Sequence, residues 1–327
     1  MIISNTKASR YLAVPLALAI LMISLCLLNE SAFGVEENIQ APHGISIDLS
    51  DYMYLTDAYN FIQKFDSNGT FIMGFGSAGS GSGKLDDPHG IAVDSSGFIY
   101  VVDTGNNRVQ KFDSEGNFLI RWGSDGTEEG QFSHPHDVAV DSSGNVYVGD
   151  YWNSNVQKFD SDGNFITVWG SNGTEDGQFL NIGDQAGVEG IDVDSLGNVY
   201  VADSGNSRVQ KFDSDRNFIT KWGSNGTGDG QFIYPSGLAV GPNDIVYVSD
   251  EGRKNIQKFD SDGNFITKWG SPGYEDGQFG HNHYLDVDSD NNIYVTDPGF
   301  EKDPDNEDAG FVQKFNSDSK LVAKMVD

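Results

Sequence analysis

A segment of 46 or 47 residues, with one copy of 53, repeats six times along most of the chain. Its opening motif reads "PHGIAVD" at Pro88 and "PHDVAVD" at Pro135. The equivalent motifs begin at residues 42, 88, 135, 188, 235 and 282. A period of this size is typical of propellers and solenoids, so each copy is expected to be one supersecondary unit packed against the next.

Each unit contains four short runs of strand-forming residues. In the second unit they are "GIAVD", "FIYVVD", "RVQKFD" and "FLIRWG", and the turn-forming segments "SSG", "TGNN" and "SEGN" separate them. The fourth run alternates between two faces, as in a half-buried outer strand, whereas the first is almost entirely apolar, as in an inner strand. Four-stranded units repeated radially predict an all-β fold, a six-bladed β-propeller of antiparallel blades over residues 42–327.

The repeat resembles the NHL repeat. The shared pattern is P-x-G-I-A-V-D-x-x-G-N-V-Y-V-x-D-x-x-N-x-R-V-Q-K-F-D, and it covers nearly all of the chain after residue 41. Since each unit contains all four strands, the first and last of the six blades are expected to close the ring without exchanging a strand. NHL propellers bind proteins, bind RNA or catalyse reactions, so the resemblance alone leaves the function open.

The first 34 residues have a different composition. Lys7 and Arg10 precede an apolar run from Leu12 to Leu28, and small residues lead up to Gly34. This order predicts a secretory signal peptide over residues 1–34, followed by a linker over residues 35–41. If the segment is retained, it is expected to act as a membrane anchor. The predicted location is outside the cell, at the cell surface or in the periplasm, with no membrane contact after cleavage.

Charge and cysteine content exclude several classes of function. The formal net charge is −29, which repels phosphate backbones, so no nucleic-acid partner is expected. The single cysteine, Cys26, lies in the predicted signal peptide. The mature chain therefore has no thiolate zinc site, cysteine nucleophile or RING module, and without disulfides it needs a large hydrophobic core. A monomer is expected.

Residues that occur in all six units are interpreted as scaffold. An aspartate ends the second strand run of every unit, and a glutamine occupies the third run. A side chain required in every blade is expected to hold a turn rather than to catalyse a reaction. The aspartates are Asp57, Asp103, Asp150, Asp203, Asp250 and Asp297.

The second position of each unit differs between blades and is the main candidate for chemistry. It is occupied by His43, His89, His136, Glu189, Ser236 and His283. The innermost strands begin at one mouth of the central channel, so these side chains are expected to face that opening. Imidazole and carboxylate are ligands for zinc and other divalent ions. Blades two, four and six offer His89, Glu189 and His283 as a candidate site for zinc or calcium; alternatively, the histidines were copied with the repeat and bind nothing.

The same positions are similar to those of the peptidyl-hydroxyglycine amidating lyase, an NHL-like propeller that holds zinc with histidines from alternating blades. The resemblance implies a catalytic role for Tyr151, because "YWNSN" partly matches the "Y-x-N-S-R" loop of that family. The chain departs from the pattern in two ways. No alternating trio is all histidine, and Ser204 stands where the family has an arginine, which leaves Arg253 as the nearest substitute. Metal-dependent lyase activity is therefore the alternative function.

The main functional prediction is a non-enzymatic binding module that uses the channel-mouth face. Two insertions, residues 181–187 and 300–310, are expected to emerge on this face, where loops on a rigid scaffold often bind ligands. Aromatic side chains nearby favour a protein, peptide or glycan ligand. The residues expected to contact it are His43, His136, Trp152, Tyr234, Arg253 and Tyr284.

Overall fold

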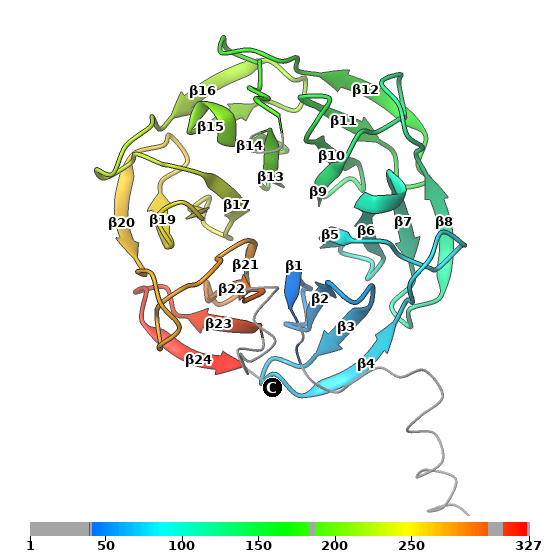
Figure 1. Cartoon of the computed structure of the whole chain (residues 1–327), viewed down its shortest axis with the longest axis horizontal. Coiled ribbons are helices and arrows are strands. Elements are labelled where there is room, and N and C mark those ends of the chain that lie inside the picture. The colour runs from blue at the N-terminus through cyan, green and yellow to red at the C-terminus, as the bar shows by residue number, and fades with distance from the viewer. Residues whose placement is uncertain (1–38, 40, 184–186, 300–309, 326–327) are drawn as a thin grey trace, which may run out of the picture. The chain divides into compact units, whose positions relative to one another are not determined.

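The computed structural model describes residues 39, 41–183, 187–299 and 310–325. In the compact unit that begins at Glu37, six four-stranded antiparallel sheets form a ring around a central channel (Figure 1). The strands of each sheet follow chain order, so the first and last blades close the ring without exchanging a strand. The six-bladed β-propeller is confirmed. The predicted signal peptide or anchor lies outside the described residues.

The first three blades contain strands β1 to β12. Blade one comprises β1 (Pro42–Ile47), β2 (Met53–Asp57), β3 (Ile62–Phe65) and β4 (Phe71–Phe75). Blade two comprises β5 (Pro88–Val93), β6 (Ile99–Asp103), β7 (Arg108–Phe112) and β8 (Phe118–Trp122), with the short 3₁₀ helix η1 (Thr104–Asn106) between β6 and β7. Blade three comprises β9 (Pro135–Val140), β10 (Val146–Asp150), β11 (Asn155–Phe159) and β12 (Phe165–Trp169).

The last three blades contain strands β13 to β24. Blade four comprises β13 (Val188–Val193), β14 (Val199–Asp203), the 3₁₀ helix η2 (Ser204–Asn206), β15 (Arg208–Phe212) and β16 (Phe218–Trp222). Blade five comprises β17 (Pro235–Val240), β18 (Val246–Asp250), β19 (Asn255–Phe259) and β20 (Phe265–Trp269). Blade six comprises β21 (Leu285–Val287), β22 (Ile293–Asp297), β23 (Phe311–Phe315) and β24 (Leu321–Met325).

Five innermost strands begin at the residues predicted from the repeat, and the sixth begins later. β21 starts at Leu285 rather than at residue 282. The preceding segment still follows the second strand, because the backbone N–H of His283 donates to the carbonyl oxygen of Thr296 at 3.1 Å. The histidine of blade six therefore keeps the same place at the mouth as its counterparts.

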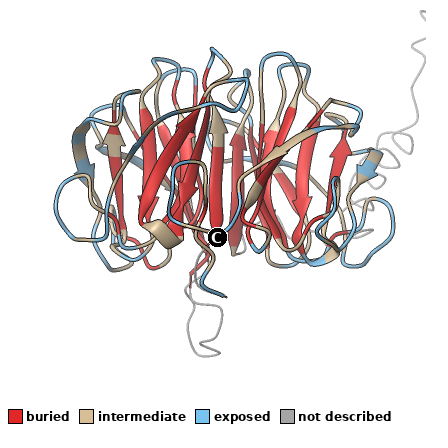
Figure 2. Cartoon of the chain, turned by 90° about the horizontal axis from the view of Figure 1, so that it is seen from above, coloured by how far each residue is buried: buried red, intermediate tan, exposed pale blue. Residues whose placement is uncertain are grey.

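Hydrophobic clusters between neighbouring blades hold the ring together. The inner strands of each blade are mostly buried, whereas the outermost strands are partly exposed and most connecting turns are exposed (Figure 2). Between blades two and three, Tyr100 packs with Val146 and Phe159. Between blades six and one, Tyr294 packs with Met53, so an equivalent cluster closes the ring. Among the described residues, no helix is long and apolar enough to cross a membrane.

The repeated aspartates fasten the loops at the mouth to the second strand. Asp150 at the end of β10 accepts hydrogen bonds from the Ser133 backbone at 2.9 Å and from the Asn153 side chain at 2.7 Å. Asp203 at the end of β14 accepts them from the Leu180 backbone at 3.0 Å and from Arg208 Nε at 2.7 Å. These bonds support the interpretation of the aspartates as scaffold.

Candidate ligand and metal site at the channel mouth

The innermost strands bulge at the residue that faces the channel. In blade one, Pro42 pairs with Asp57 and Ile45 with Leu55, so β1 contains one residue more than β2 over this stretch. Blades two, four and five repeat the irregularity at the same point. A bulge of this kind redirects a side chain, here the histidine or glutamate in the second position of the unit.

Glycine after this position brings neighbouring blades close together. A Cβ atom on Gly44 would lie 2.2 Å from the carbonyl oxygen of His89, and one on Gly237 would lie 2.5 Å from that of His283. Neither position has room for a side chain, because the next blade's backbone fills it. The close approach is what brings second-position residues of adjacent blades into contact.

The second-position residues form a buried ring, which we call the mouth ring. Its members are His43, His89, His136, Glu189, Ser236 and His283. The ring centroids of His43 and His89 are 4.8 Å apart, and those of His89 and His136 are 4.5 Å apart. His136 Nδ1 lies 2.7 Å from Glu189 Oε2. Ser236 differs, since its hydroxyl lies 2.9 Å from the Ser249 hydroxyl within its own blade.

A second set of side chains, two residues earlier in each unit, surrounds the mouth ring. These residues, which we call the outer ring, are Ala41, Asp87, His134, Gly187, Tyr234 and His281. The Tyr234 hydroxyl donates to Glu189, Asp87 Oδ2 lies 3.5 Å from His89 Nε2, and the His281 ring stacks on His283 at 5.4 Å. All six histidines of the chain belong to these two rings.

Of the outer ring, only Tyr234 was predicted as a binding residue, although the sequence contains a signal for the other positions. Side chains two residues apart on a strand point to the same face, so the position two residues before each mouth-ring residue should lie next to it. His134 and His281 occupy this position in "HPH" and "HNH". The two short motifs therefore mark both rings at once.

A cavity of about 370 Å³ opens among these side chains. Tyr151 lies against His136 with ring centroids 4.9 Å apart and an interplanar angle of 30°, and its hydroxyl is 3.5 Å from that of Tyr234. Trp152 is 49% exposed and lies 4.7 Å from His134, centroid to centroid. The volume lies in the range of small-ligand sites. The lining residues are His134, His136, Tyr151, Trp152, Glu189, Tyr234, Glu251, His281 and His283.

The remaining predicted binding residues do not line this cavity. His43 and His89 belong to the neighbouring part of the mouth ring. The Tyr284 hydroxyl donates to the carbonyl oxygen of His136 at 3.1 Å. Arg253 is partly exposed, and its backbone N–H donates to the carbonyl oxygen of Asp250.

The first insertion supports one wall of the cavity. The Asn181 side chain donates to the carbonyl oxygens of Tyr151 and Trp152, both at 3.1 Å. Residues 184–186 of this insertion and residues 300–309 of the second insertion lie outside the described residues. The link from Asn181 to the Tyr151–Trp152 turn therefore places the start of the first insertion at the candidate site.

His136 and Glu189 form a buried ion pair. Burial opposes the charged form of His136, but the charge of Glu189 and the hydrogen bond to it raise the pKa of this imidazole. Burial also opposes ionisation of Glu189, and His136 together with the Tyr234 hydroxyl lowers the pKa of the carboxyl group. The pair is therefore charged when no other cation lies beside Glu189.

The other imidazoles of the mouth ring are neutral near pH 7. Burial, followed by the nearby His89, lowers the pKa of His43 to about 3. Burial also lowers the pKa of His89, and it holds the pKa of His283 well below its ordinary value. Among the described residues, the Nδ1 atoms of His43, His89 and His283 are buried without a hydrogen-bond partner. Each such atom costs about 1–3 kcal/mol unless water or a cation binds it.

Two groups of side chains have donor atoms close enough to share a metal ion. The donors of His136, Glu189 and His283 lie within 4.8 Å of one another, and so do those of His43, Asp87 and His89. The structure thus groups Glu189 and His283 with His136, whereas sequence analysis grouped them with His89. Two imidazoles and one carboxylate are a donor set that fits catalytic zinc and other transition ions.

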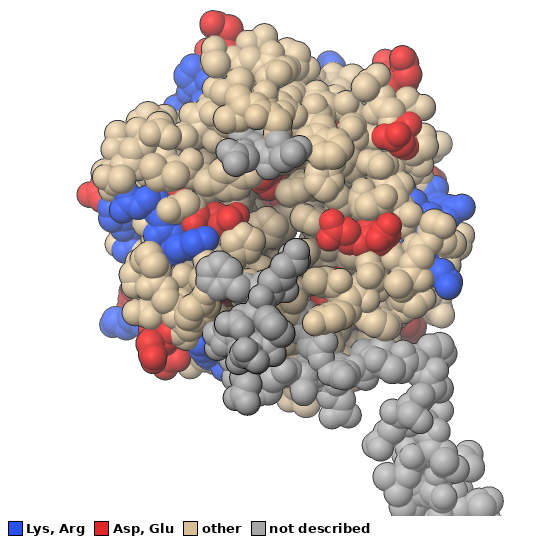
Figure 3. All heavy atoms as spheres, in the orientation of Figure 1, with Lys and Arg blue, Asp and Glu red and all other residues tan. Residues whose placement is uncertain are grey.

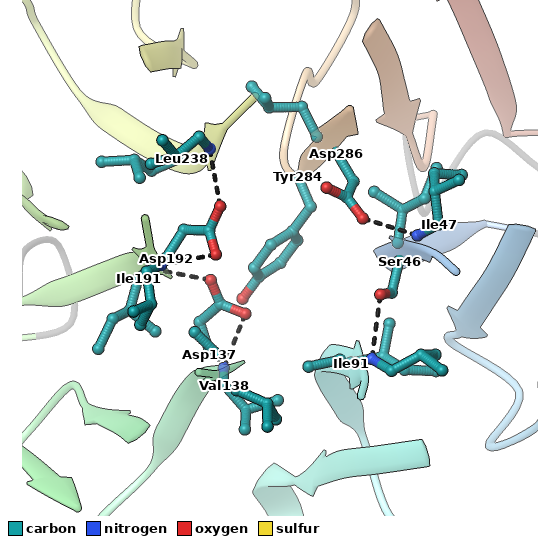
Figure 4. Close-up of a pocket in the computed structure, with 18 residues that line it drawn as sticks. Ser46, Ile47, Ile91, Asp137, Val138, Ile191, Asp192, Leu238, Tyr284 and Asp286 are labelled. Atoms are coloured by element: carbon teal, nitrogen blue, oxygen red, sulfur yellow. Dashed lines mark hydrogen bonds between the residues drawn. The ribbon is translucent and has the colours of Figure 1, made fainter. Parts of the chain in front are cut away.

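Three carboxylates line the channel below the mouth, around a cavity of about 200 Å³ (Figure 4). Asp137 accepts a hydrogen bond from the backbone of Ile191 at 2.9 Å, and Asp192 accepts one from Val240 at 2.7 Å. Each carboxylate therefore links the inner strands of two blades, as Asp286 does through its bond with the Ile47 backbone at 2.6 Å.

The channel carboxylates have raised pKa values. Burial raises the pKa of Asp137 to about 7 and that of Asp286 to about 6. Burial, followed by the charge of Asp286, raises the pKa of Asp192 to about 8. On the face shown in Figure 3, Lys and Arg lie mostly toward the rim of the ring. Among the described residues, no lysine or arginine contributes appreciably to the pKa shifts of the three channel carboxylates.

Comparison with known proteins identifies the NHL repeat in residues 85–112, 132–159, 186–212 and 232–259. No curated protein matches the sequence. A solved streptogramin B lyase is 13% identical over 90% of this chain and 86% of its own, with a TM-score of 0.60. A virginiamycin B lyase from Staphylococcus aureus is 12% identical over 89% of this chain and 87% of its own, with a TM-score of 0.59.

A gluconolactonase from Xanthomonas campestris also matches. It is 15% identical over 79% of this chain and 84% of its own, with a TM-score of 0.56. At such low identities, the three solved structures show a shared fold and nothing about substrate.

Proposed function

The chain belongs to the NHL-repeat β-propellers, and from this premise we propose that it is a binding module that holds a peptide or glycan in the cavity at its channel mouth. The observation that carries the proposal is the cavity of about 370 Å³, which residues from several blades enclose. The predicted export of the chain would place this cavity in contact with extracellular ligands.

The chemistry of the cavity lining supports such a ligand. Trp152 offers a half-exposed indole, and Tyr151 and Tyr234 add aromatic surface together with hydroxyl groups. Aromatic side chains bury much apolar area at a low entropic cost and often dominate binding energy. Glu251 and His281, which are 2.7 Å apart at the edge of the cavity, offer further polar contacts.

Arrays of short peptides and of glycans, probed with the purified protein, test this proposal. Ligands of the cavity should bind Trp152→Ala at least about tenfold more weakly than the wild type, as expected when a central aromatic contact is removed. The matched control is Leu196→Ala, because Leu196 is 77% exposed in the turn between β13 and β14 and does not line the cavity. If every array ligand binds the wild type and Trp152→Ala equally well, the cavity is not the binding site.

A metal-dependent lyase is the second candidate, and the grouping of His136, Glu189 and His283 favours it. The donor set fits a divalent ion, and the buried, unpartnered Nδ1 of His283 is the kind of atom that such an ion would satisfy. A bound ion would act as a Lewis acid toward a substrate oxygen. The shared fold with streptogramin B lyase is compatible with this candidate but does not establish it.

The surrounding residues have defined roles in this candidate. Tyr234 donates to Glu189 and so fixes the carboxylate orientation. Tyr151 is held against His136 by stacking, which places its hydroxyl at the cavity wall, where it is the candidate group to donate a proton to a bound substrate. The aromatic wall would exclude water from the bound substrate.

Incubation of the zinc-loaded protein with a peptidyl-hydroxyglycine substrate tests the lyase candidate. Mass spectrometry should detect cleavage that Tyr151→Phe reduces by about 10²-fold or more, as expected for loss of a group that transfers a proton. Lys221→Ala is a suitable control, because Lys221 is exposed on β16, the outermost strand of blade four, pairs with Asp176 and does not line the cavity. Absence of cleavage by zinc-loaded wild type would reject this candidate and leave the binding proposal intact.

A further inference from the structure

We propose that the channel mouth holds a second divalent metal ion, bound by His43, Asp87 and His89. These residues lie beside the group that contains Glu189, so the mouth would carry two metal ions in adjacent blades. The inference goes beyond the proposed function, since it concerns a different set of ligands and does not depend on which substrate or ligand the cavity binds.

The geometry of the second group is that of a ligand set. One donor atom from each of His43, Asp87 and His89 lies within 4.8 Å of the others. The two imidazoles are 93% and 91% buried, and the carboxylate is half exposed at the edge of the mouth. Two imidazoles with one carboxylate leave coordination positions open for solvent or a ligand.

Unpartnered nitrogen atoms point independently to a cation. Within the described part of the chain, the Nδ1 atoms of both His43 and His89 are buried and have no hydrogen-bond partner. A buried polar atom of this kind normally has a protein, water or metal partner. Two such atoms therefore occur on the two imidazoles of this one group of possible ligands.

The chain positions Asp87 for this role. Asp87 has a φ of 50°, a left-handed backbone conformation that is uncommon for residues other than glycine. Its backbone N–H donates to the Asn60 side chain at 2.7 Å, which ties the residue to blade one. His43 comes from blade one and His89 from blade two, so Asp87 lies at the boundary between the two blades that supply the imidazoles.

The two groups are neighbours within the mouth ring. The ring centroids of His89 and His136 are 4.5 Å apart, and those of His43 and His283 are 5.9 Å apart. Each group has its own carboxylate, Asp87 in one and Glu189 in the other. The second ion would therefore bind without taking a ligand from the first.

A simpler role for Asp87 is an ion pair with His89, whose Nε2 atom is 3.5 Å from the carboxylate. This role leaves the buried Nδ1 atoms of His43 and His89 unexplained, because the contact uses only Nε2. A simple ion pair also predicts that no metal ion is bound by His43, Asp87 and His89. The two roles can thus be separated by counting bound ions.

Metal stoichiometry of the purified protein tests the proposal. Protein stripped with a chelator is titrated with Zn²⁺ in competition with a chromophoric chelator, and bound zinc is counted by mass spectrometry after desalting. We expect two zinc ions per chain for the wild type and one for His43→Gln, Asp87→Asn or His89→Gln. Glu189→Gln should also retain one ion, and Asp87→Asn combined with Glu189→Gln should retain none. His134→Gln is the matched control, a histidine at the same mouth that belongs to neither group, and it should retain two.

The outcomes separate this proposal from the metal site of the lyase candidate. One ion in the wild type that persists in Asp87→Asn and is lost in Glu189→Gln overturns the second site and supports the first. One ion that is lost in Asp87→Asn and persists in Glu189→Gln supports the second site alone. No ion in a wild type whose circular dichroism matches that of a folded β-propeller overturns both sites.

Discussion

The repeated aspartate and the mouth-ring residue of each blade are 14 residues apart in the sequence, and their polar atoms are satisfied very differently. Asp203 receives hydrogen bonds from a loop backbone and from the Asn206, Arg208 and Gln210 side chains. His283, equally buried, has an Nδ1 atom with no hydrogen-bond partner among the described residues. The polar atoms of Asp203 are thus used to hold a loop and a neighbouring strand, whereas the Nδ1 atom of His283 remains available to a ligand.

The difference teaches how to interpret a repeat protein. Side chains that are identical in all blades hold the scaffold together, so their polar groups are engaged in hydrogen bonds within it. Positions that vary, such as the mouth ring and the outer ring, carry groups that the scaffold does not need. Substitution of a repeated aspartate should therefore mainly lower stability. Substitution of a residue in the mouth ring or the outer ring should mainly lower ligand binding.

Removal of a repeated aspartate should give the largest effect on stability. Asp203→Ala leaves the buried Arg208 guanidinium without its counter-ion, and we expect the free energy of unfolding to fall by about 3–5 kcal/mol. Urea denaturation followed by circular dichroism measures the change. Asp176→Ala is the control, because its ion pair with Lys221 is exposed and should contribute about 0–1 kcal/mol. If Asp203→Ala and Asp176→Ala both lower the free energy of unfolding only slightly, the repeated aspartates are not the scaffold residues proposed here.

The channel carboxylates should make the protein less stable as pH rises. The pKa of Asp192 is about 8 in the folded protein and about 3.9 in the unfolded chain, so ionisation favours the unfolded chain as pH rises from about 4 to about 8. Because the channel leaves Asp192 partly exposed, solvent reduces the effect, and we expect about 1–2 kcal/mol. Urea midpoints at pH 6.5 and 8.5 should differ less for Asp192→Asn than for the wild type. If the two midpoints differ by as much in Asp192→Asn as in the wild type, Asp192 is not responsible for the loss of stability at high pH.

The mouth histidines should make the protein less stable as pH falls. Burial, followed by the charge of His136, lowers the pKa of His134 to about 4, whereas the unfolded chain binds this proton near pH 6.5. Stability is therefore lost as pH falls from about 6.5 to about 4, the opposite direction to that of Asp192. His134→Gln should reduce this loss by about 1 kcal/mol, since His134 is partly exposed. Thermal denaturation at pH 4.5 and 6.5 measures the loss of stability. A larger loss in His134→Gln than in the wild type would contradict the role given to His134.

Truncation of the exposed cavity residue should have the smallest effect on stability. Trp152 is 49% exposed, so Trp152→Ala should change the free energy of unfolding by about 0.5 kcal/mol or less. The same variant is expected to lose ligand binding on the arrays. A destabilisation comparable to that of Asp203→Ala would mean that Trp152 belongs to the scaffold, and any loss of binding would then reflect unfolding.

Much of the fold could be predicted from the sequence because the same pattern of four strands and their turns occurs in six copies. The turn-forming residues and the four strand runs place every blade, and five of the six innermost strands begin at the predicted residue. Blade six departs from this rule: "NHYLD" lacks the proline and the glycine of the motif, and its first strand is assigned only from Leu285. The mouth ring follows from the same register, since second-position residues must begin the inner strands.

The candidate site was less predictable, because it depends on contacts between blades. Tyr234 was predicted to contact a ligand and lines the cavity, whereas Glu251 was not predicted, because it lies in a loop whose path the strand pattern does not specify. Arg253 was expected beside them, but its side chain does not line the cavity. Residues of one loop can face different directions, and a strand period gives no information about a loop.

The sequence by itself determined the number of blades, the order of the strands and which position of each unit faces the channel, because these follow from the period of the repeat and from the two-residue period of a strand. Only the tertiary structure decided which of the inward-facing residues meet. Gly44 lets blade one approach blade two, where His43 contacts His89. His136 contacts Glu189 across the boundary between blades three and four. Contacts of this kind depend on the distance between inner strands and on side-chain rotamers, which packing around the whole ring fixes.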